Sequence, residues 1–398
     1  MAAPAERVVI VGGGIHAVST AYFLTQRGIK PTVVERSAIA AAASGKAGGF
    51  LAREWGDGAT VELHHQGYDL HKTLAAELGV ESYREVPTLS LAGGRREKSK
   101  SKSTRAPPAS WISPNAATEP MHGPTAQVTP LELTTKLWAA AERGGATLLI
   151  DTVTGVELDE DDAAVTAVTL AGRSGQPTRL PADKVVLAMG PWTGPLAEDW
   201  LGIEFPMQGI KSTSIVFADC KPVVAAPFAC FCEEDANGCH LELYPRPNGE
   251  VYVCGVGGSD YVSGDRLREG GDCESPELIK ANPARAEAAT KSFSGLTTLG
   301  GRAPDVAQAC MRPCPEDGLP SMGEVPGVAG AFISAGHNCW GILWGPISGK
   351  AMAEAVADGK ASSVDLRAFN PGRFTAQRKK PKRARGRHNG SVEVGEQW

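Results

Sequence analysis

The sequence predicts an α/β fold with two parts, a Rossmann-like nucleotide-binding domain that is discontinuous along the chain and a second domain rich in antiparallel β-structure. Three observations lead to this prediction. A short apolar run, "RVVIV", meets the glycines of "GGGIHA" and then a helix-like stretch. A second strand, glycine turn and helix, "GAFISAGHNCWGILWGP", follows far downstream. Between them lies a long stretch of strand-like runs that alternate in polarity.

The composition is that of an ordinary globular protein. The 398 residues are 42% hydrophobic and 21% charged, with a net charge of −5, and this length suits two interleaved domains. No apolar run approaches the roughly 18 residues that cross a bilayer. The nine cysteines contain no paired sets at zinc-finger spacing. We therefore expect a reduced, cytoplasmic protein without a metal site or a transmembrane segment.

The amino-terminal segment is typical of a βαβ unit with short connections. We expect Arg7–Val11 to be a buried strand, Ile15–Gln26 to be a helix that ends at Gly28, and Pro31–Glu35 to be the next strand. The small residue Ala17 lets this helix sit close against a sheet.

Later elements carry similar signals. Thr129 can cap a helix in which Pro130 takes the first position and Glu132 closes a capping box. The pair Asn248-Gly249 predicts a hairpin in the strand-rich centre. Four further strands are expected at Ala146–Ile150, Val153–Leu158 and Val165–Leu170 and at the start of Asp183–Gly194, and the last helix ends at Gly359.

These elements divide the chain into domains. We expect the nucleotide-binding domain to comprise residues 1–84, 124–203 and 311–367, and the second domain to comprise 85–123 and 204–310, with a basic loop at 93–108. Residues 368–398 contain "RKKPKRARGR" (Arg378–Arg387) and are expected to be a solvated, disordered tail. This run could alternatively direct nuclear import, but no aromatic residues interleave to stack bases, so no nucleic-acid partner is expected.

The glycines after the first strand fit a dinucleotide fingerprint that has alanine in its last place. Gly12 lets the chain turn tightly, Gly14 leaves room for a pyrophosphate at the helix amino terminus, and Ala17 keeps helix and sheet close. Glu35, which ends the second strand 23 residues after Gly12, can accept hydrogen bonds from an adenosine ribose. We therefore predict nucleotide binding at this turn.

Three features favour FAD over NAD as this nucleotide. A loop of small residues, Ser44–Phe50, suits backbone contact with a large cofactor. The strand "KVVLAMG" returns far downstream, as it does when insertions interrupt a nucleotide domain. Gly336 and Gly341 lie between a strand and a helix, so a second helix amino terminus can stabilise a reduced, anionic flavin ring.

Taken together, the motifs resemble a known family. The fingerprint with "VVER", then "ASGKAGG", "VVLAMGPWT", "CMRPCPEDGLPSMG" and "GHNCWGI", occur in the order typical of the FAD-dependent D-amino-acid, glycine and sarcosine oxidases. The resemblance covers residues 5 to 365 and is strongest to a little-characterised eukaryotic branch. It implies FAD as the cofactor and an amine or amino acid as the substrate.

The candidate cofactor-binding residues lie in these motifs. His16 could contact the pyrophosphate, where the helix end would lower its pKa, or it could pack outward. His337 is expected to shape the turn at the flavin. The full set comprises Gly12, Gly14, Ile15, His16, Ala17, Glu35, Arg36, Ser44, Gly45, Lys46, Ala47, Gly48, Val153, Ala188, Gly190, Trp192, Cys310, Gly336, His337, Gly341 and Ile342.

The resemblance also implies a substrate site. Arg312 matches the arginine that clamps the substrate carboxylate in D-amino-acid and glycine oxidases, where a guanidinium can make two parallel hydrogen bonds. Arg312 could alternatively pair with Glu316 or Asp317 as a structural group. Trp340, Tyr244 and Tyr261 are the expected pocket-wall residues.

The chain departs from the family pattern in ways that bear on the substrate. Glycine oxidase-like members carry a further arginine in the Gly-His segment, where this chain has Cys339 and Trp340. Cys310 falls on the position that binds flavin covalently in sarcosine oxidase-like members, although a buried, unreactive thiol is the more common role. Lys46 and Lys211 are the only candidates considered for an oxygen-activating lysine, and neither clearly matches.

The expected reaction follows from the electron path. No second Gly-x-Gly-x-x-Gly follows a strand, so no NADPH site is expected, and the electrons come from the substrate and leave to molecular oxygen or another acceptor. We expect oxidation of a small amino acid or N-substituted amine by hydride transfer to the flavin, with an imine and hydrogen peroxide as products. The alternative is a flavin-binding scaffold or regulatory protein with little turnover.

Overall fold

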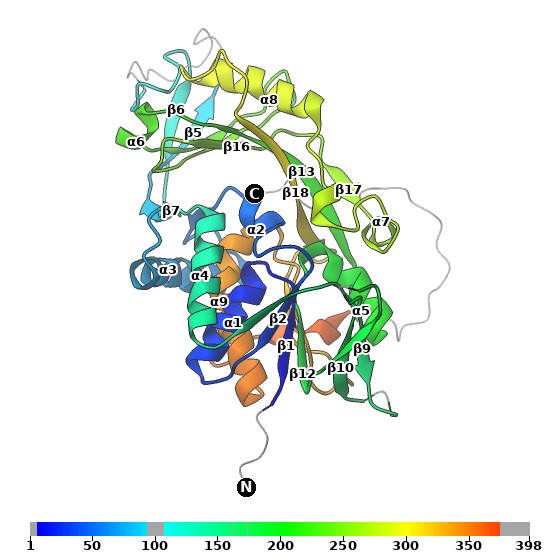
Figure 1. Cartoon of the computed structure of the whole chain (residues 1–398). Coiled ribbons are helices and arrows are strands. Elements are labelled where there is room, and N and C mark those ends of the chain that lie inside the picture. Colours follow the sequence, from blue (N-terminus) through cyan, green and yellow to red (C-terminus); the bar gives the residue numbers. More distant parts are fainter. Residues whose placement is uncertain (1–5, 94–106, 162, 173, 375–398) are drawn as a thin grey trace, which may run out of the picture.

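A six-stranded sheet forms the centre of the first part of the molecule, in the order β19-β20-β12-β1-β2-β8 (Figure 1). The computed structural model describes residues 6–93, 107–161, 163–172 and 174–374. All neighbouring strands of this sheet are parallel except β19, which lies antiparallel at one edge. The strands are β1 (Val8–Val11), β2 (Thr32–Glu35), β8 (Thr147–Ile150), β12 (Lys184–Leu187), β19 (Ser321–Glu324) and β20 (Ala331–Ala335).

Both faces of this sheet are covered, which explains why β1 is a continuous apolar run. Val8 and Ile10 belong to the core that contains residues of α1 (Ile15–Gln26), α4 (Pro130–Arg143) and α9 (Gly341–Asp358). Val9 and Val11 belong to the opposite core. That core contains residues of a three-stranded sheet made of β9 (Val153–Leu158), β10 (Val165–Leu170) and β11 (Thr178–Pro181).

The second part is a mainly antiparallel eight-stranded sheet. The long strands β13 and β18 pair along most of their length, from Met207 opposite Pro315 to Val216 opposite Val306. α8 (Pro283–Leu296) covers one face, where the rings of Phe217 and Phe293 stack at 4.2 Å. The strands are β5 (Thr88–Ala92), β6 (Ala117–Met121), β13 (Met207–Phe217), β14 (Ala229–Cys232), β15 (Glu242–Pro245), β16 (Val251–Cys254), β17 (Asp260–Val262) and β18 (Val306–Pro315).

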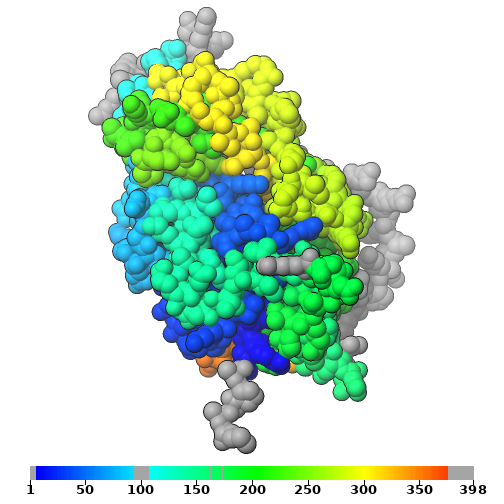
Figure 2. Space-filling view, in the orientation of Figure 1, coloured from blue at the N-terminus to red at the C-terminus, as the bar shows by residue number. Residues whose placement is uncertain are grey.

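The remaining elements are a small sheet and several helices. A small sheet, β3-β7-β4, lies below the large sheet, and Figure 2 shows the yellow and yellow-green part of the chain seated on the blue and teal part. These elements are α2 (Ala43–Lys46), α3 (Val61–Leu78), α5 (Thr193–Leu201), α6 (Pro222–Ala225), α7 (Gly264–Leu267), β3 (Phe50–Ala52), β4 (Arg84–Glu85) and β7 (Thr125–Gln127). The predicted fold class, parallel Rossmann-like sheet plus antiparallel sheet, is confirmed.

Several predicted elements keep their bounds. Ile15–Gln26 is helical, Gly28 and Gly359 have positive φ beyond their helices, and Asn248-Gly249 joins the antiparallel strands β15 and β16. The predicted capping box is wrong. Thr129 makes no side-chain cap, and the Glu132 carboxylate instead accepts the backbone N–H groups of Glu81 and Ser82 at 2.8 and 2.9 Å.

The ordered fold continues beyond residue 368, where the tail was predicted to begin. Phe369 and Phe374 are buried, and Arg373 pairs with Asp317 at 2.6 Å, so the expectation of disorder is wrong for residues 368–374. The basic run Arg378–Arg387 and most of the predicted basic loop at 93–108 lie outside the described residues. β18 also runs through the predicted domain boundary between residues 310 and 311.

Candidate flavin and substrate site

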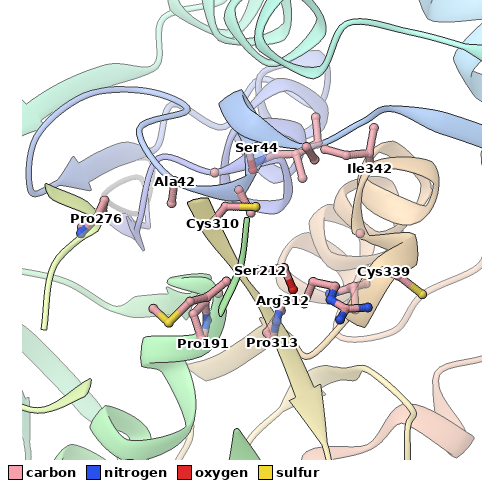
Figure 3. Close-up of a pocket in the computed structure, with 18 of the residues that line it drawn as sticks. Ala42, Ser44, Pro191, Ser212, Pro276, Cys310, Arg312, Pro313, Cys339 and Ile342 are labelled. Atoms are coloured by element: carbon pink, nitrogen blue, oxygen red, sulfur yellow. The ribbon is translucent and has the colours of Figure 1, made fainter. Parts of the chain in front are cut away.

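A pocket of about 340 Å³ lies where the two parts of the molecule meet. The first residues of α1 and of α9 border it, although their sequences are far apart. Its opposite wall comes from β13, β15, β16 and β18 of the large sheet. Figure 3 shows Cys310 and Arg312 on β18, with Ala42 and Ser44 on one side and Cys339 and Ile342 on the other. We use "nucleotide half" for the part at α1 and α2, and "sheet half" for the wall from the large sheet.

The nucleotide half is built around the start of α1. Gly12 adopts a φ of +110°, and a Cβ there would lie 2.6 Å from the carbonyl oxygen of Ala188. A Cβ on Gly14 would meet only the Ser44 hydroxyl, at 3.2 Å, so the space in front of the helix is open. Gly12 is therefore required for the tight turn of the chain, and the lack of a side chain at Gly14 leaves open space in front of the helix.

Two side chains hold this turn in place. Glu35 accepts the backbone N–H of Gly13 at 2.6 Å and that of Ser37 at 2.9 Å. The hydroxyl of Ser44 accepts the backbone N–H of Ile15 at 2.9 Å. Burial raises the pKa of Glu35, and the hydrogen bonds from Ser37 and Gly13 oppose that rise. The carboxylate thus reaches the pocket from the end of β2, where the sequence predicted it.

The two helix starts contribute one histidine each. The rings of His16 on α1 and His337 before α9 stack with centroids 3.6 Å apart. Burial lowers the pKa of His16 to about 3 and that of His337 well below its usual range, so both rings are neutral near pH 7. His16 borders the pocket, and burial accounts for its lowered pKa.

The sheet half carries the charged side chains. Arg312 lies on β18 opposite Ile210 of β13, two residues from Cys310, which lies opposite Ser212. Glu242 on β15 lies opposite Cys254 on β16 and is only 9% exposed. The Tyr244 hydroxyl and the Cys254 thiol both donate hydrogen bonds to one oxygen of the Glu242 carboxylate. The sheet half therefore brings a guanidinium and a carboxylate to one wall.

Most predicted site residues do border this pocket. Burial raises the pKa of Cys310, which keeps its thiol protonated near pH 7. A covalent link between Cys310 and flavin stays a prediction. The predicted residues that line the pocket are Gly12, Gly14, Ile15, His16, Glu35, Arg36, Ser44, Ala47, Gly48, Val153, Ala188, Gly190, Trp192, Tyr244, Cys310, Arg312, His337, Trp340, Gly341 and Ile342.

Five predicted residues do not line it: Ala17, Gly45, Lys46, Gly336 and Tyr261. Tyr261 as a pocket wall is wrong, because side chains alternate along β17, and Val262 points into the core while Tyr261 is 39% exposed. Ala17 is fully buried at the helix–sheet contact, as its packing role requires. A Cβ on Gly45 would clash with Ala40, and one on Gly336 would lie 2.6 Å from Pro315.

The two candidate lysines are not among the residues that line the pocket. The charge of Lys46 nevertheless acts on the Cys310 thiol, and its backbone oxygen accepts a hydrogen bond from Gln308 at 3.0 Å. Lys211 pairs with Asp260 at 2.8 Å. Neither lysine side chain is thus placed on the pocket surface.

Several residues of the sheet half were not predicted from the sequence, among them Glu242, Cys254 and Phe231, which line the pocket. The signal for Glu242 was present in "HLELYP": Leu241 and Leu243 are fully buried on one face of the strand, so Glu242 shares the other face with Tyr244.

The residues present fit a dinucleotide with a ring system at one end. The Nδ1 atoms of His16 and His337 are buried and have no hydrogen-bond partner among the described residues, which a polar ligand in the pocket could supply. The open turn at Gly14 fits a pyrophosphate, Glu35 fits a ribose, and the start of α9 fits the electron-rich edge of a flavin. This fold and this site define a dinucleotide-dependent oxidoreductase of the Rossmann type.

Comparison with known proteins identifies the family. The model of the "FAD dependent oxidoreductase" family matches residues 7–355, and the chain belongs to this family. FAD is its cofactor, and the protein is an FAD-dependent oxidoreductase.

Individual relatives agree with this assignment. A Schizosaccharomyces pombe protein named as an oxidoreductase is 28% identical, and the match covers 92% of this chain and 98% of the length of that protein. Glycine oxidase of Pseudomonas aeruginosa is 27% identical, with the same 92% and 98% coverage. The crystal structure of L-proline dehydrogenase from P. horikoshii superposes with a TM-score of 0.76 at 18% identity, covering 94% of this chain and 98% of that chain. This last likeness shows the shared fold.

Two further properties concern the described part of the chain. None of its helices combines the length and apolarity that crossing a membrane requires. Its histidine, cysteine and acidic side chains form no group of three placed to hold a metal ion. His64 and His71 on α3 instead bond to the backbone oxygens of Ala52 and Ile342, at 2.8 and 2.9 Å.

Proposed function

We propose that this protein oxidises a small amino acid or N-substituted amine to an imine, with molecular oxygen as the electron acceptor and hydrogen peroxide as the second product. The C–H bond beside nitrogen breaks, two electrons leave with the hydrogen, nitrogen releases a proton, and a C=N bond forms. When bound, FAD accepts the two electrons. Water then hydrolyses the imine to a carbonyl compound and an amine or ammonia.

The observation that carries this proposal is the position of Arg312. Its side chain lies in the same pocket as the starts of α1 and α9, close enough to Glu242 for their charges to interact. A half-buried guanidinium can hold a carboxylate by two hydrogen bonds and so fix the carbon beside it. Similarity to glycine oxidases supports an amino-acid substrate for this site.

The remaining walls of the pocket suit orientation and exclusion of water. Trp340 packs against Trp55 and His64, with ring centroids 6.2 and 4.6 Å away. Phe50 stacks on Tyr244 at 5.3 Å. These rings restrict the space near Arg312, and we propose that they favour a small substrate over one with a long side chain.

Anaerobic reduction of the bound flavin tests the proposal. The purified protein, loaded with FAD, is mixed with a panel of amino acids and N-methylated amino acids, and bleaching of the yellow absorbance is followed. We expect at least one member to bleach the flavin, and Arg312→Ala to slow this by about 100-fold or more, as loss of a buried charge partner does. Arg312→Lys should retain part of the rate because it keeps the charge but not the paired geometry.

Retention of FAD by Arg312→Ala, measured from its absorbance, is the control for folding. If no member of a broad panel bleaches the wild-type flavin, the protein acts as a flavin-binding scaffold and the proposal is wrong. If bleaching occurs equally fast in Arg312→Ala, the assigned role of Arg312 is wrong. Peroxide measured on admission of air tests oxygen as the acceptor.

A further inference from the structure

The sheet half contains a second charged group whose role is not explained by carboxylate binding. Glu242 is 9% exposed and lines the pocket together with Arg312. A buried carboxylate is costly unless other groups compensate its charge. Its described hydrogen-bond donors are the Tyr244 hydroxyl and the Cys254 thiol, the latter at 3.5 Å. Both donors are neutral. They orient the carboxylate, and the positive charge that acts on it is that of Arg312.

The orientation of Glu242 follows from the pleat of β15. Leu241 and Leu243 are fully buried in the core beneath α8, and Glu242 and Tyr244 face the opposite side, toward the pocket. Cys254 lies directly opposite Glu242 in the register of β15 and β16. Both described donors bond to Oε2, and neither bonds to Oε1. The carboxylate can therefore accept a hydrogen bond from a ligand that enters the pocket.

Arg312 and Glu242 give this wall one positive and one negative group. Burial raises the pKa of Glu242, while the hydrogen bonds from Tyr244 and Cys254 and the charge of Arg312 oppose the rise. A pocket with one anionic and one cationic wall group matches a ligand that has both charges, as a zwitterionic amino acid does. A simple carboxylate would meet Arg312 favourably but would be repelled by Glu242.

The surroundings of Glu242 are largely apolar. Phe231 lies opposite Glu242 in the pairing of β14 with β15, and its ring is 5.1 Å from that of Phe50 and 6.0 Å from that of Tyr244. All three rings border the pocket. Alkyl groups on nitrogen would gain contact with such a surface, and aromatic rings near a cation add further attraction.

We infer that Glu242 binds the positively charged nitrogen of a zwitterionic substrate. This inference rests on the proposed function, because it assumes that Arg312 holds the carboxylate. It makes Glu242 a specificity-determining residue. The proton that the nitrogen loses before oxidation can pass to the same carboxylate, which becomes a neutral carboxylic acid.

Two ligands of nearly equal shape test this inference by binding. Glycine betaine and 3,3-dimethylbutanoate have the same branched skeleton and carboxylate, and differ in a positively charged nitrogen against a neutral carbon. Neither is expected to be oxidised. Each is titrated into FAD-loaded protein, and its dissociation constant is taken from the perturbation of the flavin absorbance spectrum. The wild-type protein should bind glycine betaine at least tenfold more tightly.

Glu242→Gln should remove this preference, because it keeps the shape and the hydrogen-bonding capacity but not the charge. Glu119→Gln is the matched control, since Glu119 lies on β6 of the same sheet and is exposed, and it should leave the preference unchanged. Arg312→Lys should weaken the binding of both ligands by similar factors. FAD content and near-ultraviolet circular dichroism of each variant verify folding.

The outcomes separate this inference from the proposed function. Equal binding of the two ligands by the wild-type protein, or an unchanged preference in Glu242→Gln, overturns the role of Glu242 while the bleaching test can still succeed. Failure of both ligands to bind the wild-type protein overturns it as well. If the substrate panel produces no bleaching, the proposed function fails first. The wild-type comparison is decisive even if Glu242→Gln does not fold.

Discussion

The two halves of the pocket are built from different kinds of chemical group. The nucleotide half presents backbone N–H groups at the start of α1, held by Glu35 and Ser44. The sheet half presents side chains, with Arg312 and Glu242 coming from strands that are separated by about 70 positions along the chain. Backbone groups offer the same chemistry in any sequence with this turn. Side chains on strands can change one by one, so we expect the nucleotide half to fix the cofactor and the sheet half to select the substrate.

Substitution of Gly14 in the glycine turn is expected to have the largest effect of the variants that test this division of roles. Gly14→Val would place a branched side chain where the open space lies in front of α1, while the fold itself meets only the Ser44 hydroxyl there. We expect FAD affinity to fall by about 100-fold, equivalent to roughly 3 kcal/mol. Fluorescence titration of the apoprotein with FAD measures this change.

A glycine at the other end of the same helix provides the control. Gly28 has a φ of +77° and no heavy atom within 4 Å of an added Cβ. Gly28→Ala should cost about 1 kcal/mol of stability through backbone strain and leave FAD affinity unchanged. Wild-type FAD affinity in Gly14→Val would show that the start of α1 does not hold the cofactor.

The pH dependence of stability is a second test, because neutral, buried histidines pack at the starts of α1 and α9. His71 is buried and bonds to the backbone oxygen of Ile342 at the start of α9, and burial lowers its pKa to about 4. Below its unfolded pKa of about 6.5, the unfolded chain binds more protons than the folded one, so stability falls as pH falls. Because of this histidine, the free energy of unfolding should fall by about 2 kcal/mol between pH 7 and pH 5.

His71→Gln should flatten this pH dependence, and urea denaturation at pH 7 and pH 5 measures it. His16 and His337 shift in the same direction, so part of the slope should persist. His65→Gln is the control, because His65 lies on the same helix but at the surface, paired with Glu54 at 3.0 Å. An unchanged slope in His71→Gln would show that the buried ring is not the source.

The smallest effect is expected from a single hydroxyl in the sheet half. Tyr244→Phe removes the donor to Glu242 but keeps the ring that stacks on Phe50. We expect the rate of flavin reduction at low substrate concentration to fall by about fivefold, or roughly 1 kcal/mol, with FAD affinity unchanged.

Stopped-flow reduction of Tyr244→Phe by the best substrate of the panel measures this rate. Tyr22→Phe is the control, because Tyr22 is buried on α1 and does not line the pocket. A large loss of FAD affinity in Tyr244→Phe, without a change in substrate selectivity, would contradict the division between the halves.

The same contrast explains what the sequence could predict. Gly12, Gly14 and Glu35 lie within one βαβ unit, so their spacing alone predicted that they meet at one turn, and all three border the same pocket. The second helix start, at Gly341, could also be predicted from the sequence, since a strand and a glycine turn precede it. Most of the nucleotide half, and the start of α9, can therefore be predicted from local chain geometry.

The sheet half depends on contacts that local patterns do not specify. Glu242 becomes a pocket residue only because β15 lies between β14 and β16, with α8 covering its other face. Tyr261 was assigned to the wall as an aromatic residue of the strand-rich centre, but the direction of its side chain depends on the register of β17 with β13. The role of Glu132 was likewise changed by a segment distant in sequence, Glu81–Ser82.

Ligand competition tests most directly the central claim that one FAD molecule spans the starts of α1 and α9. Apoprotein is titrated with FAD in the presence of ADP, of riboflavin, or of both. We predict that ADP and riboflavin bind without competing with each other, and that one equivalent of FAD per chain displaces both. Displacement of ADP alone, with riboflavin left bound, would contradict the claim that the two helix starts hold the two ends of a single cofactor.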